Sequence, residues 1–572
     1  PSETRMSGCK AKTLQHARFT RNTRVIIIDP RYTDSMVSVG DEWIPIRPGT
    51  DAALSAALAY VMITEDLIDK PFLAKYTIGY DEESLPKGAP AGSSYKSYIL
   101  GQGPDKTPKT PAWASRITGI PPARIEKLAR ETAEAKPCFI CQGWGPQRTT
   151  NGENISRAIG MLAVLTGNVG IKGGNTGARE NAGYKLPMAT FPTLENPVKT
   201  EHSCFNWYQA IDDYKQMTAT TAGIRGRERL IAPIKFIWNY AGNCLTNQHG
   251  GINQMHPILL DDKKCETIVV IDTTLTPSAR YADFLLPSCL NLEEHDWTSD
   301  GDSNIAYVIF DNKCIEPLGE AKSIYDICAG VANELGVKEA FTEGRTQYQW
   351  LEKLYAESRK AIPELPPTLE EAYTMGVYKR YFPKNHIAYK AFRDDPEANP
   401  LPSPSGKIEI YSPRLAELAE TWTLLPGQAI TALPEYIPNP EGAISPERKE
   451  WPLQLIGHHY KQRTHSTYGN CWWLQEVAPQ ELWINPIDAK ACGIEFGDRV
   501  KVFNGRGVSF VKAKTTPRIM PGVVSLPEGA WHTPNAAGED TNGCVNVLTK
   551  PLPTALAKGN PHHTNLVQVE KA

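Results

Sequence analysis

Residues 138–177, CFICQGWGPQRTTNGENISRAIGMLAVLTGNVGIKGGNTG, decide the fold of this chain. The apolar start, residues 138–141, predicts a short buried strand, and the Gly-rich segment after it holds Trp144 and Arg148. Apolar residues at helical spacing over 153–165 predict an amphipathic helix, and a second Gly-rich loop completes the stretch. This order brings backbone N–H groups, an aromatic ring and an arginine beside a helix N-terminus, which favours binding of a large, planar anion.

Strands and helices are predicted to alternate on both sides of this stretch. The apolar runs before Asp29, Asn243 and Asp272 each predict a buried strand that ends in a small polar side chain. Helices are predicted over residues 52–67 and 121–135, so the fold class is α/β with a mostly parallel sheet. Since ligands bind outside the carboxyl ends of parallel strands, the three polar ends favour one dinucleotide-like site, although ordinary turn chemistry explains any single one of them.

A β-rich domain is predicted to begin near residue 451. Residues 338–450 are rich in proline and predict irregular connections around a helix at 347–361. Short apolar runs separated by turns follow, and Asn504-Gly505 is typical of a hairpin. These runs predict a closed barrel.

The polar loops of this barrel are rich in histidine. His458 and His459 are adjacent, so in a strand they face opposite ways, and neither an HxH nor an HExxH spacing is present. Hydrogen bonding is therefore expected of these histidines rather than metal ligation. Arg463 lies two residues before His465 and its hydroxyl-bearing neighbours, a combination that favours phosphate binding, with an exposed polar turn as the alternative.

The composition is that of a soluble protein of 572 residues, long enough for two to four domains. The 61 basic and 64 acidic residues are mixed along the chain and give a net charge of −3, so no nucleic-acid partner is indicated. No apolar run is long enough to predict a membrane span. Twelve cysteines are scattered, and the single CxxC, Cys138 and Cys141, is interpreted as core thiols because a zinc or iron–sulfur site needs about four ligands.

Several runs together resemble the molybdopterin-dependent dimethyl sulfoxide reductase family. They extend from residue 1 to about residue 569, so the resemblance covers essentially the whole chain. The runs that carry it are PSETRMSG (1–8), IDPRYTD (28–34), WIPIRPGTDAAL (43–54), ICQGWGPQR (140–148), LTGNVGIKGGNTGARE (165–180), PIKFIWNYAGN (233–243), RYADFLLP (280–287), SGKIEIYS (405–412), YKQRTHSTYGN (460–470), WINPIDA (483–489), EGAWH (528–532) and AKGNPHHTNLV (557–567).

The resemblance implies the molybdopterin oxidoreductase fold, with parallel-sheet α/β domains and a C-terminal double-psi β-barrel. Three domains are expected: an α/β dinucleotide-binding domain over 1–170, a second α/β domain with an irregular connector over 171–435, and a barrel that binds the dinucleotide over 436–572. The implied cofactor is bis(molybdopterin guanine dinucleotide) with molybdenum, in a funnel between the domains. A carboxylate accepts hydrogen bonds from guanine N1–H and N2–H, which selects guanine over adenine.

The residues that match cofactor-binding segments of this family are spread over the whole chain. They are Ile28, Asp29, Gly49, Thr50, Asp51, Trp144, Gly145, Arg148, Asn243, Asn247, Asp272, Gly457, His458, Arg463, His465, Ser466, Thr467, Asn546, His562 and His563. Walker A, GxSxG and GxGxxG motifs are absent, and no catalytic acid, base or metal ligand is assigned.

The resemblance implies reduction of S-oxides and N-oxides, such as dimethyl sulfoxide to dimethyl sulfide, by oxygen-atom transfer in anaerobic respiration. It also implies an iron–sulfur electron-transfer subunit and a quinol-oxidising membrane-anchor subunit, on the periplasmic side of the bacterial inner membrane. Family members carry an N-terminal region with a [4Fe–4S] cluster, the molybdenum ligand and an export signal, so this chain is expected to be an N-terminally truncated fragment that is inactive alone. A selenate reductase of the same architecture and a non-catalytic nucleotide-binding module are the alternatives.

Overall fold

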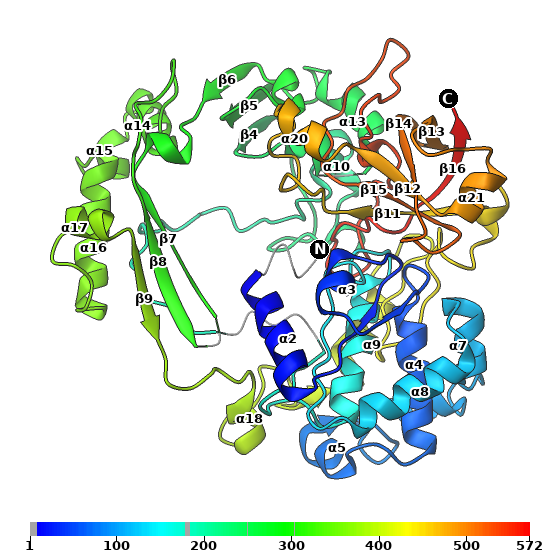
Figure 1. Ribbon diagram of the computed structural model, residues 1–572. Coiled ribbons are helices and arrows are strands. Elements are labelled where there is room, and N and C mark those ends of the chain that lie inside the picture. The colour runs from blue at the N-terminus through cyan, green and yellow to red at the C-terminus, as the bar shows by residue number, and fades with distance from the viewer. Residues whose placement is uncertain (1–7, 178–182, 249, 303) are drawn as a thin grey trace.

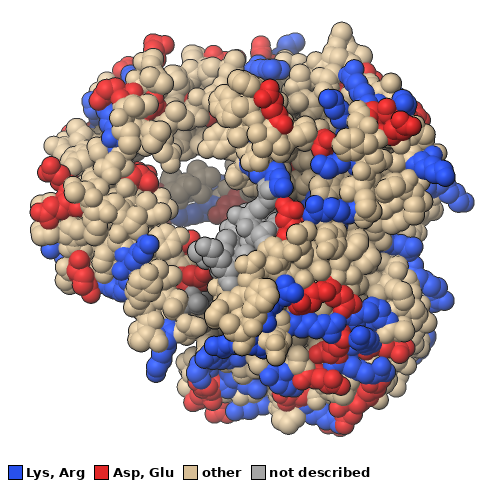
Figure 2. Space-filling model, viewed as in Figure 1, with Lys and Arg blue, Asp and Glu red and all other residues tan. Residues whose placement is uncertain are grey.

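The computed structural model describes residues 8–177, 183–248, 250–302 and 304–572. Residues 1–7 of the opening run and residues 178–180 of LTGNVGIKGGNTGARE therefore lie outside the described residues. Figure 1 shows a helical part, a barrel, a parallel sheet and an outlying antiparallel sheet arranged around a central space. The space-filling view shows the surface hollowed between the outlying sheet and the helical part, with both signs of charge mixed over this face (Figure 2).

The helical part is built around one alanine-rich helix, α4 (Asp51–Thr64). Its small side chains are buried nearly all round, so other helices can approach it closely. Those helices are α7 (Pro111–Thr118), α8 (Pro122–Glu134) and α9 (Gly152–Leu165). The helices predicted over 52–67, 121–135 and 153–165 are thus confirmed within a few residues.

Two short parallel pairs of strands complete this part. β1 (Ile26–Ile28) pairs with β2 (Glu42–Ile44), and β3 (Thr77–Ile78) pairs with β10 (Ile408–Glu409). β10 comes from a connection that the sequence predicted to be irregular. The same connection also contains the helix α16 (Gln347–Ala361), which matches the predicted bounds.

The prediction of a strand at residues 138–141 is wrong. The segment is extended, but its alternate N–H groups are taken by asparagine side chains: Cys138 donates to Asn168 Oδ1 at 2.9 Å and Ile140 donates to Asn175 Oδ1 at 3.2 Å. Cys138 is half-buried and Cys141 is exposed, so the two are not core thiols. Side-chain amide oxygens thus accept the hydrogen bonds that a neighbouring strand would otherwise accept along this edge of the segment.

A parallel sheet of β4 (Phe236–Tyr240), β5 (Thr267–Asp272) and β6 (Phe284–Pro287) confirms the two predicted strands that lead to Asn243 and Asp272. The helices α10 (Trp207–Asp212) and α13 (Ile252–Leu259) pack their apolar residues on the central strand. An antiparallel sheet follows, formed by β7 (Asp296–Gly301), β8 (Ile305–Asp311) and β9 (Val377–Tyr381). The helices α14 (Ile324–Glu334), α15 (Lys338–Thr342), α16 and α17 (Leu369–Met375) lie beside it (Figure 1).

The C-terminal part is a closed six-stranded barrel, as the sequence predicted. Its strands lie in the order β11 (Leu453–His458), β15 (Val523–Pro527), β12 (Glu481–Ile484), β14 (Gly507–Thr515), β13 (Arg499–Asn504) and β16 (Leu566–Lys571). Pairing of β16 with β11 closes the ring. The β13–β14 hairpin is confirmed, although its turn is centred on Gly505 and Arg506 because Asn504 still pairs with Gly507.

Candidate cofactor site

The loop after β1 lies against the barrel. The N–H of Tyr32 donates to the carbonyl oxygen of Arg518 at 2.8 Å, and the N–H of Met520 donates to the carbonyl oxygen of Pro30 at 3.0 Å. These bonds fix the backbone directly after Asp29. The carboxyl end of β1 is therefore held at the barrel, where a ligand can contact both parts.

Two carboxylates gather at this end of the helical part. Burial raises the pKa of Asp29, against a smaller lowering by Arg31, whose N–H donates to Asp29 Oδ1 at 2.8 Å. Burial, with a smaller contribution from the charge of Asp29, raises the pKa of Asp51 to about 6. Within the described ranges neither carboxylate has a lysine or arginine nitrogen within 4 Å. Ile28, which ends β1, is 38% exposed beside them.

The turn before α4 is shaped by its glycine. Gly49 has φ +75°, and a Cβ there would lie 2.4 Å from Asn439 Nδ2. The Thr50 hydroxyl is buried and donates to the carbonyl oxygen of Arg47 at 2.7 Å. This turn is therefore held by its own contacts, and Thr50 supports the backbone around Asp51.

The Trp144–Arg148 loop is tied to the C-terminal segment of the chain. The N–H of His563 donates to the carbonyl oxygen of Arg148 at 2.8 Å. The N–H of Arg148 donates to the carbonyl oxygen of Gly145 at 3.1 Å. The guanidinium of Arg148 lies 5.8 Å from the centre of the Trp144 ring. It forms no ion pair with any carboxylate in the part of the chain that the structure describes, so its charge is available to an anion.

A second glycine holds two histidines against β11. The N–H of Gly457 donates to Nδ1 of His563 at 3.2 Å. A Cβ on Gly457 would lie 2.0 Å from Nε2 of His562, so only glycine leaves room for that ring. Nε2 of His562 is buried and has no hydrogen-bond partner among the described residues. Burial lowers the pKa of His562 to about 4, so it is neutral at pH 7.

The loop that follows β11 is held mainly by its own polar groups. Nδ1 of His458 lies 2.7 Å from the Ser525 hydroxyl, and burial lowers the pKa of His458 well below its usual range. The guanidinium of Arg463 donates to Gln480 Oε1 at 3.1 Å and to the carbonyl oxygen of Glu528 at 2.9 Å. Arg463 therefore anchors the loop, and burial lowers its pKa to about 10.

The end of the same loop carries His465, Ser466 and Thr467. His465 has a left-handed φ of +51°. The carbonyl oxygen of Ser466 accepts from Trp531 Nε1 at 2.7 Å, and the hydroxyl of Thr467 donates to the carbonyl oxygen of Thr464 at 2.5 Å. These contacts fix the backbone and leave the His465 ring 58% exposed.

The asparagines after β4 link the parallel sheet to the barrel. Oδ1 of Asn243 accepts from the N–H of Ser278 at 3.0 Å, and Nδ2 of Asn243 donates to Oδ1 of Asn247 at 2.7 Å. Nδ2 of Asn247 then donates to the carbonyl oxygen of Ala530 at 2.8 Å. Asn243 is thus occupied in positioning Asn247, which reaches the barrel.

The two remaining predicted residues are Asp272 and Asn546. Oδ1 of Asp272, at the end of β5, accepts from the N–H of Thr273 at 2.8 Å, and burial raises the pKa of Asp272. Asn546 is buried in a short 3₁₀ turn, Val545–Val547, beside the barrel.

Glu528 belongs to this region and sequence reasoning missed it. It follows β15 directly, and its carboxylate faces His459 and His465. The only signal in the sequence was the run EGAWH, because the neighbours of Glu528 come from a loop far away in the chain.

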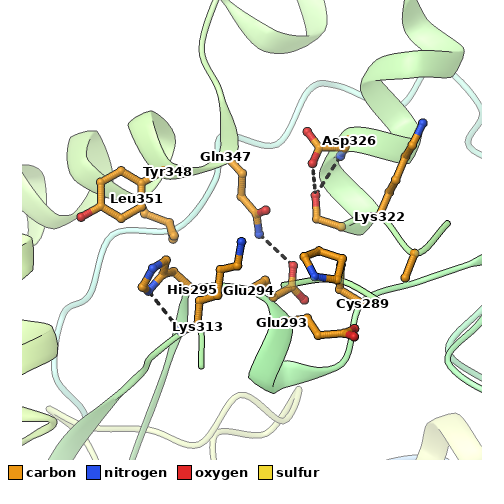
Figure 3. A pocket seen from close by; sticks show the side chains of 13 residues that line it. Cys289, Glu293, Glu294, His295, Lys313, Lys322, Asp326, Gln347, Tyr348 and Leu351 are labelled. Atoms are coloured by element: carbon orange, nitrogen blue, oxygen red, sulfur yellow. Dashed lines mark hydrogen bonds between the residues drawn. The ribbon is translucent and has the colours of Figure 1, made fainter. Parts of the chain in front are cut away.

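A half-open cavity lies elsewhere. Its volume is about 330 Å³, and Figure 3 shows its lining side chains, which come from residues 289–295 before β7, from residues 313–323 after β8 and from the helices α14 and α16. Its lining includes Glu294, whose carboxylate accepts from Gln347 Nε2 at 3.1 Å. None of the predicted cofactor residues lines it, so we place the candidate site at the barrel loops and the segments that contact them, where most of those residues lie.

Family models match most of the chain. Residues 3–334 match the model described as Molybdopterin oxidoreductase, and residues 453–566 match the Molydopterin dinucleotide binding domain. The chain belongs to the molybdopterin oxidoreductase family. The predicted fold class and the prediction of an oxidoreductase of this family are both confirmed, and the barrel is its dinucleotide-binding domain.

Individual relatives agree with this assignment. Dimethyl sulfoxide reductase DmsA of Escherichia coli K12 is 58% identical over 574 residues, which span all of this chain and 70% of that protein. Trimethylamine-N-oxide reductase of Haemophilus influenzae is 31% identical, over 96% of this chain and 67% of that protein. The structure of acetylene hydratase from Pelobacter acetylenicus superposes with a TM-score of 0.66 at 19% identity, over 97% of this chain and 75% of that chain, and so supports the fold alone.

The residues at the candidate site fit a guanine dinucleotide. Among the described residues no lysine or arginine nitrogen lies within 4 Å of the carboxylates of Asp29 and Asp51, which can accept from a base, and no carboxylate lies that close to Arg148, which can bind a phosphate. The unpartnered Nε2 of His562 beside Gly457 offers an acceptor to the N–H groups of a pterin. A bound cofactor would thus complete polar groups that the described residues leave unsatisfied.

Proposed function

We propose that this chain is the catalytic subunit of a reductase that converts S-oxides, dimethyl sulfoxide in particular, to sulfides, and that also accepts N-oxides. The observation that carries the proposal is the identity of 58% with a dimethyl sulfoxide reductase over the whole chain. The corresponding figure for the trimethylamine-N-oxide reductase is 31%. The difference favours sulfoxides as the main substrate class.

The chain's own residues bind and orient the cofactor in this proposal. Asp29 and Asp51 accept from guanine, Arg148 and His465 face its phosphates, and His562 contacts a pterin. Bis(molybdopterin guanine dinucleotide) supplies the two-electron oxygen-atom chemistry through its molybdenum when it is bound. We therefore assign no protein acid or base.

Electron supply and location follow from the same family resemblance. We infer that electrons reach the cofactor through iron–sulfur centres, which include a [4Fe–4S] cluster. An electron-transfer subunit delivers these electrons and receives them from a membrane-anchor subunit that oxidises quinol. The enzyme lies on the periplasmic side of the membrane. No helix among the described residues is long and apolar enough to cross a membrane.

The test begins with cofactor content. The protein is produced anaerobically, and its molybdenum and its acid-released guanine nucleotide are measured per polypeptide. Asp51→Asn is expected to lower guanine content about tenfold, because one good bidentate base contact is worth about 1–3 kcal/mol. Asp394→Asn, at an exposed carboxylate paired with Lys390, is the matched control and is expected to leave the content unchanged.

The substrate class is then read from activity with a reduced viologen as electron donor. Dimethyl sulfoxide is expected to be reduced faster than trimethylamine N-oxide, and both faster than selenate. A preference for selenate would replace the proposal by a selenate reductase. Wild-type protein that contains neither molybdenum nor guanine would refute the reductase proposal. The chain would then be a nucleotide-binding or interaction module.

A further inference from the structure

Glu528 lies where two neighbouring barrel strands end. β11 and β15 are parallel, and His458 is in register with Pro527, so the next residues, His459 and Glu528, also lie side by side. The N–H of Glu528 donates to the carbonyl oxygen of His458 at 2.8 Å. The position of the Glu528 side chain is thereby fixed by the barrel itself.

The Glu528 carboxylate receives two imidazole nitrogens. Nδ1 of His465 lies 3.1 Å from Oε1 and 3.3 Å from Oε2, and Nδ1 of His459 lies 3.2 Å from Oε1. The backbone at Gly529 also lies in close contact with the backbone at His465, since a Cβ on Gly529 would lie 1.9 Å from the carbonyl oxygen of His465. Glu528 and its neighbour therefore set both the backbone and the ring orientation of His465.

The other end of the His465 ring is open. Nε2 makes no hydrogen bond to a residue in the described ranges, and the side chain is 58% exposed. With Nδ1 directed at a carboxylate, the ring has the arrangement in which the second nitrogen is aimed at a ligand. Hydrogen bonding to the Glu528 carboxylate raises the pKa of His465 against opposing effects of burial and Arg148, which favours the imidazolium.

The surroundings of His465 are otherwise cationic or neutral. Arg148 and Arg463 lie close by, and Glu528 is the carboxylate that acts on the pKa of Arg463, His465, His562 and His563 alike. The titratable groups whose charges interact with the pair are Arg148, His458, His459, Arg463, His562 and His563. An anion bound here would meet repulsion from Glu528 unless a proton on His465 balanced that charge.

We propose that Glu528 is a positioning residue that keeps His465 as an imidazolium, so that its Nε2–H donates to an anionic oxygen of the dinucleotide. This inference rests on the proposed function, because it needs the dinucleotide in the site. Glu528 itself touches no ligand. It holds the Nδ1 proton and the ring, and His465 makes the contact.

The experiment measures cofactor retention against pH in the holoenzyme. Wild type, Glu528→Gln, Glu528→Asp and His465→Ala are passed over a desalting column at pH 5.5 to 9, and the guanine nucleotide that remains is measured. Wild type is expected to lose cofactor as the pH rises through the pKa of His465. Glu528→Gln is expected to lower the pH of half release by about one unit, since a nearby opposite charge shifts a pKa by about 1–3 units.

The controls separate a charge role from a structural one. Glu528→Asp keeps the charge and is expected to recover most of the wild-type midpoint. Glu539→Gln, which removes an exposed carboxylate bonded to Asn535 in the same barrel, is expected to leave the midpoint unchanged. A role in folding alone would lower retention equally at every pH and would not move the midpoint.

Three outcomes overturn the inference. The first is an unchanged midpoint in Glu528→Gln, and the second is a wild-type midpoint in His465→Ala. The third is one equivalent of zinc in the wild type that Glu528→Gln removes, because the two Nδ1 atoms would then be metal ligands instead of proton donors. Wild-type protein that never loads guanine refutes the proposed function instead, so the two failures are distinguishable.

Discussion

Replacement of Glu441 by alanine is expected to loosen the barrel more than any surface substitution. The side chain of Glu441 is 3% exposed, and its carboxylate accepts from both terminal nitrogens of Arg506 at 2.9 and 2.8 Å. It also accepts from Lys550 Nζ at 2.6 Å and from the N–H of Leu566 at 2.9 Å. One carboxylate thus joins the segment before the barrel to the β13–β14 turn and to β16.

The expected cost follows from what the variant leaves behind. Removal of one partner from a buried ion pair costs about 3–5 kcal/mol, because the remaining charge is buried without compensation. Arg506 and Lys550 are 16% and 26% exposed, so water reaches them, and we expect a loss at the low end, about 3 kcal/mol. Replacing Glu441 together with both cations by apolar residues is expected to restore part of this loss.

Hydrogen exchange read by mass spectrometry gives the assay, because a chain of this size does not unfold in two states. Peptides that cover 545–569 are expected to lose protection by a factor of about 100, which corresponds to about 3 kcal/mol. Glu539→Ala, in an exposed turn of the barrel, serves as the control and should change protection by less than about 0.5 kcal/mol. A loss below about 1 kcal/mol in Glu441→Ala would refute the reasoning.

The pH dependence provides an independent check on Glu441. Burial raises the pKa of Glu441, but hydrogen bonds and charge from Arg506 and Lys550 outweigh burial, so the net pKa is lowered. A carboxyl group with a lowered folded pKa stabilises the fold above its unfolded pKa of about 4.3, and that contribution is lost only as the pH falls through the folded value. The deficit of the variant should therefore be constant between pH 5.5 and 8 and should shrink under stronger acid.

Two further predictions concern the candidate site, and a third concerns two histidines, His256 in α13 and His532. Burial raises the pKa of Asp51 to about 6, above its value of about 3.9 in the unfolded chain, so its ionisation opposes folding increasingly between these two values and fully above pH 6; Asp51→Asn should therefore raise the melting temperature more at pH 7.5 than at pH 4.5. Gly457→Ala would place a Cβ 2.0 Å from His562 Nε2, so we expect about 1–3 kcal/mol of destabilisation by thermal unfolding and a measurable loss of guanine content. Burial lowers the pKa of both His256 and His532 to about 4, so hydrogen-exchange protection of α13 should fall as the pH drops from 6.5 toward 4; constant protection would contradict this.

Much of the fold could be predicted because its signals are local. Helical spacing gave α8, α9 and α16 within a few residues, and turn chemistry at Asn504-Gly505 gave a barrel hairpin. Closure of the barrel also followed from the run of short strands. In each case the residues that determine the structure lie within a few positions of one another.

The failures arose where distant side chains decide the structure. Residues 138–141 have the composition of a strand, yet Asn168 and Asn175 take their alternate N–H groups. The same limit hid Glu528, which meets His465 only because β11 and β15 are neighbours in the barrel. Strand order is set by the closed ring and is not encoded in any single stretch of sequence.

The candidate site is held together by bonds between separate parts of the chain, and those bonds come from the loops that carry its residues. Tyr32 bonds to a barrel turn, the carbonyl oxygen of Arg148 accepts from His563, and Asn247 donates to Ala530. A dinucleotide across these loops would add contacts to each of them at once. Cofactor binding and the mutual arrangement of the helical part, the parallel sheet and the barrel should therefore be coupled, because a ligand that binds only the assembled arrangement stabilises it by mass action. Loss of any one of these bonds should accordingly weaken the binding of both ends of the cofactor, including the end that the altered loop does not touch.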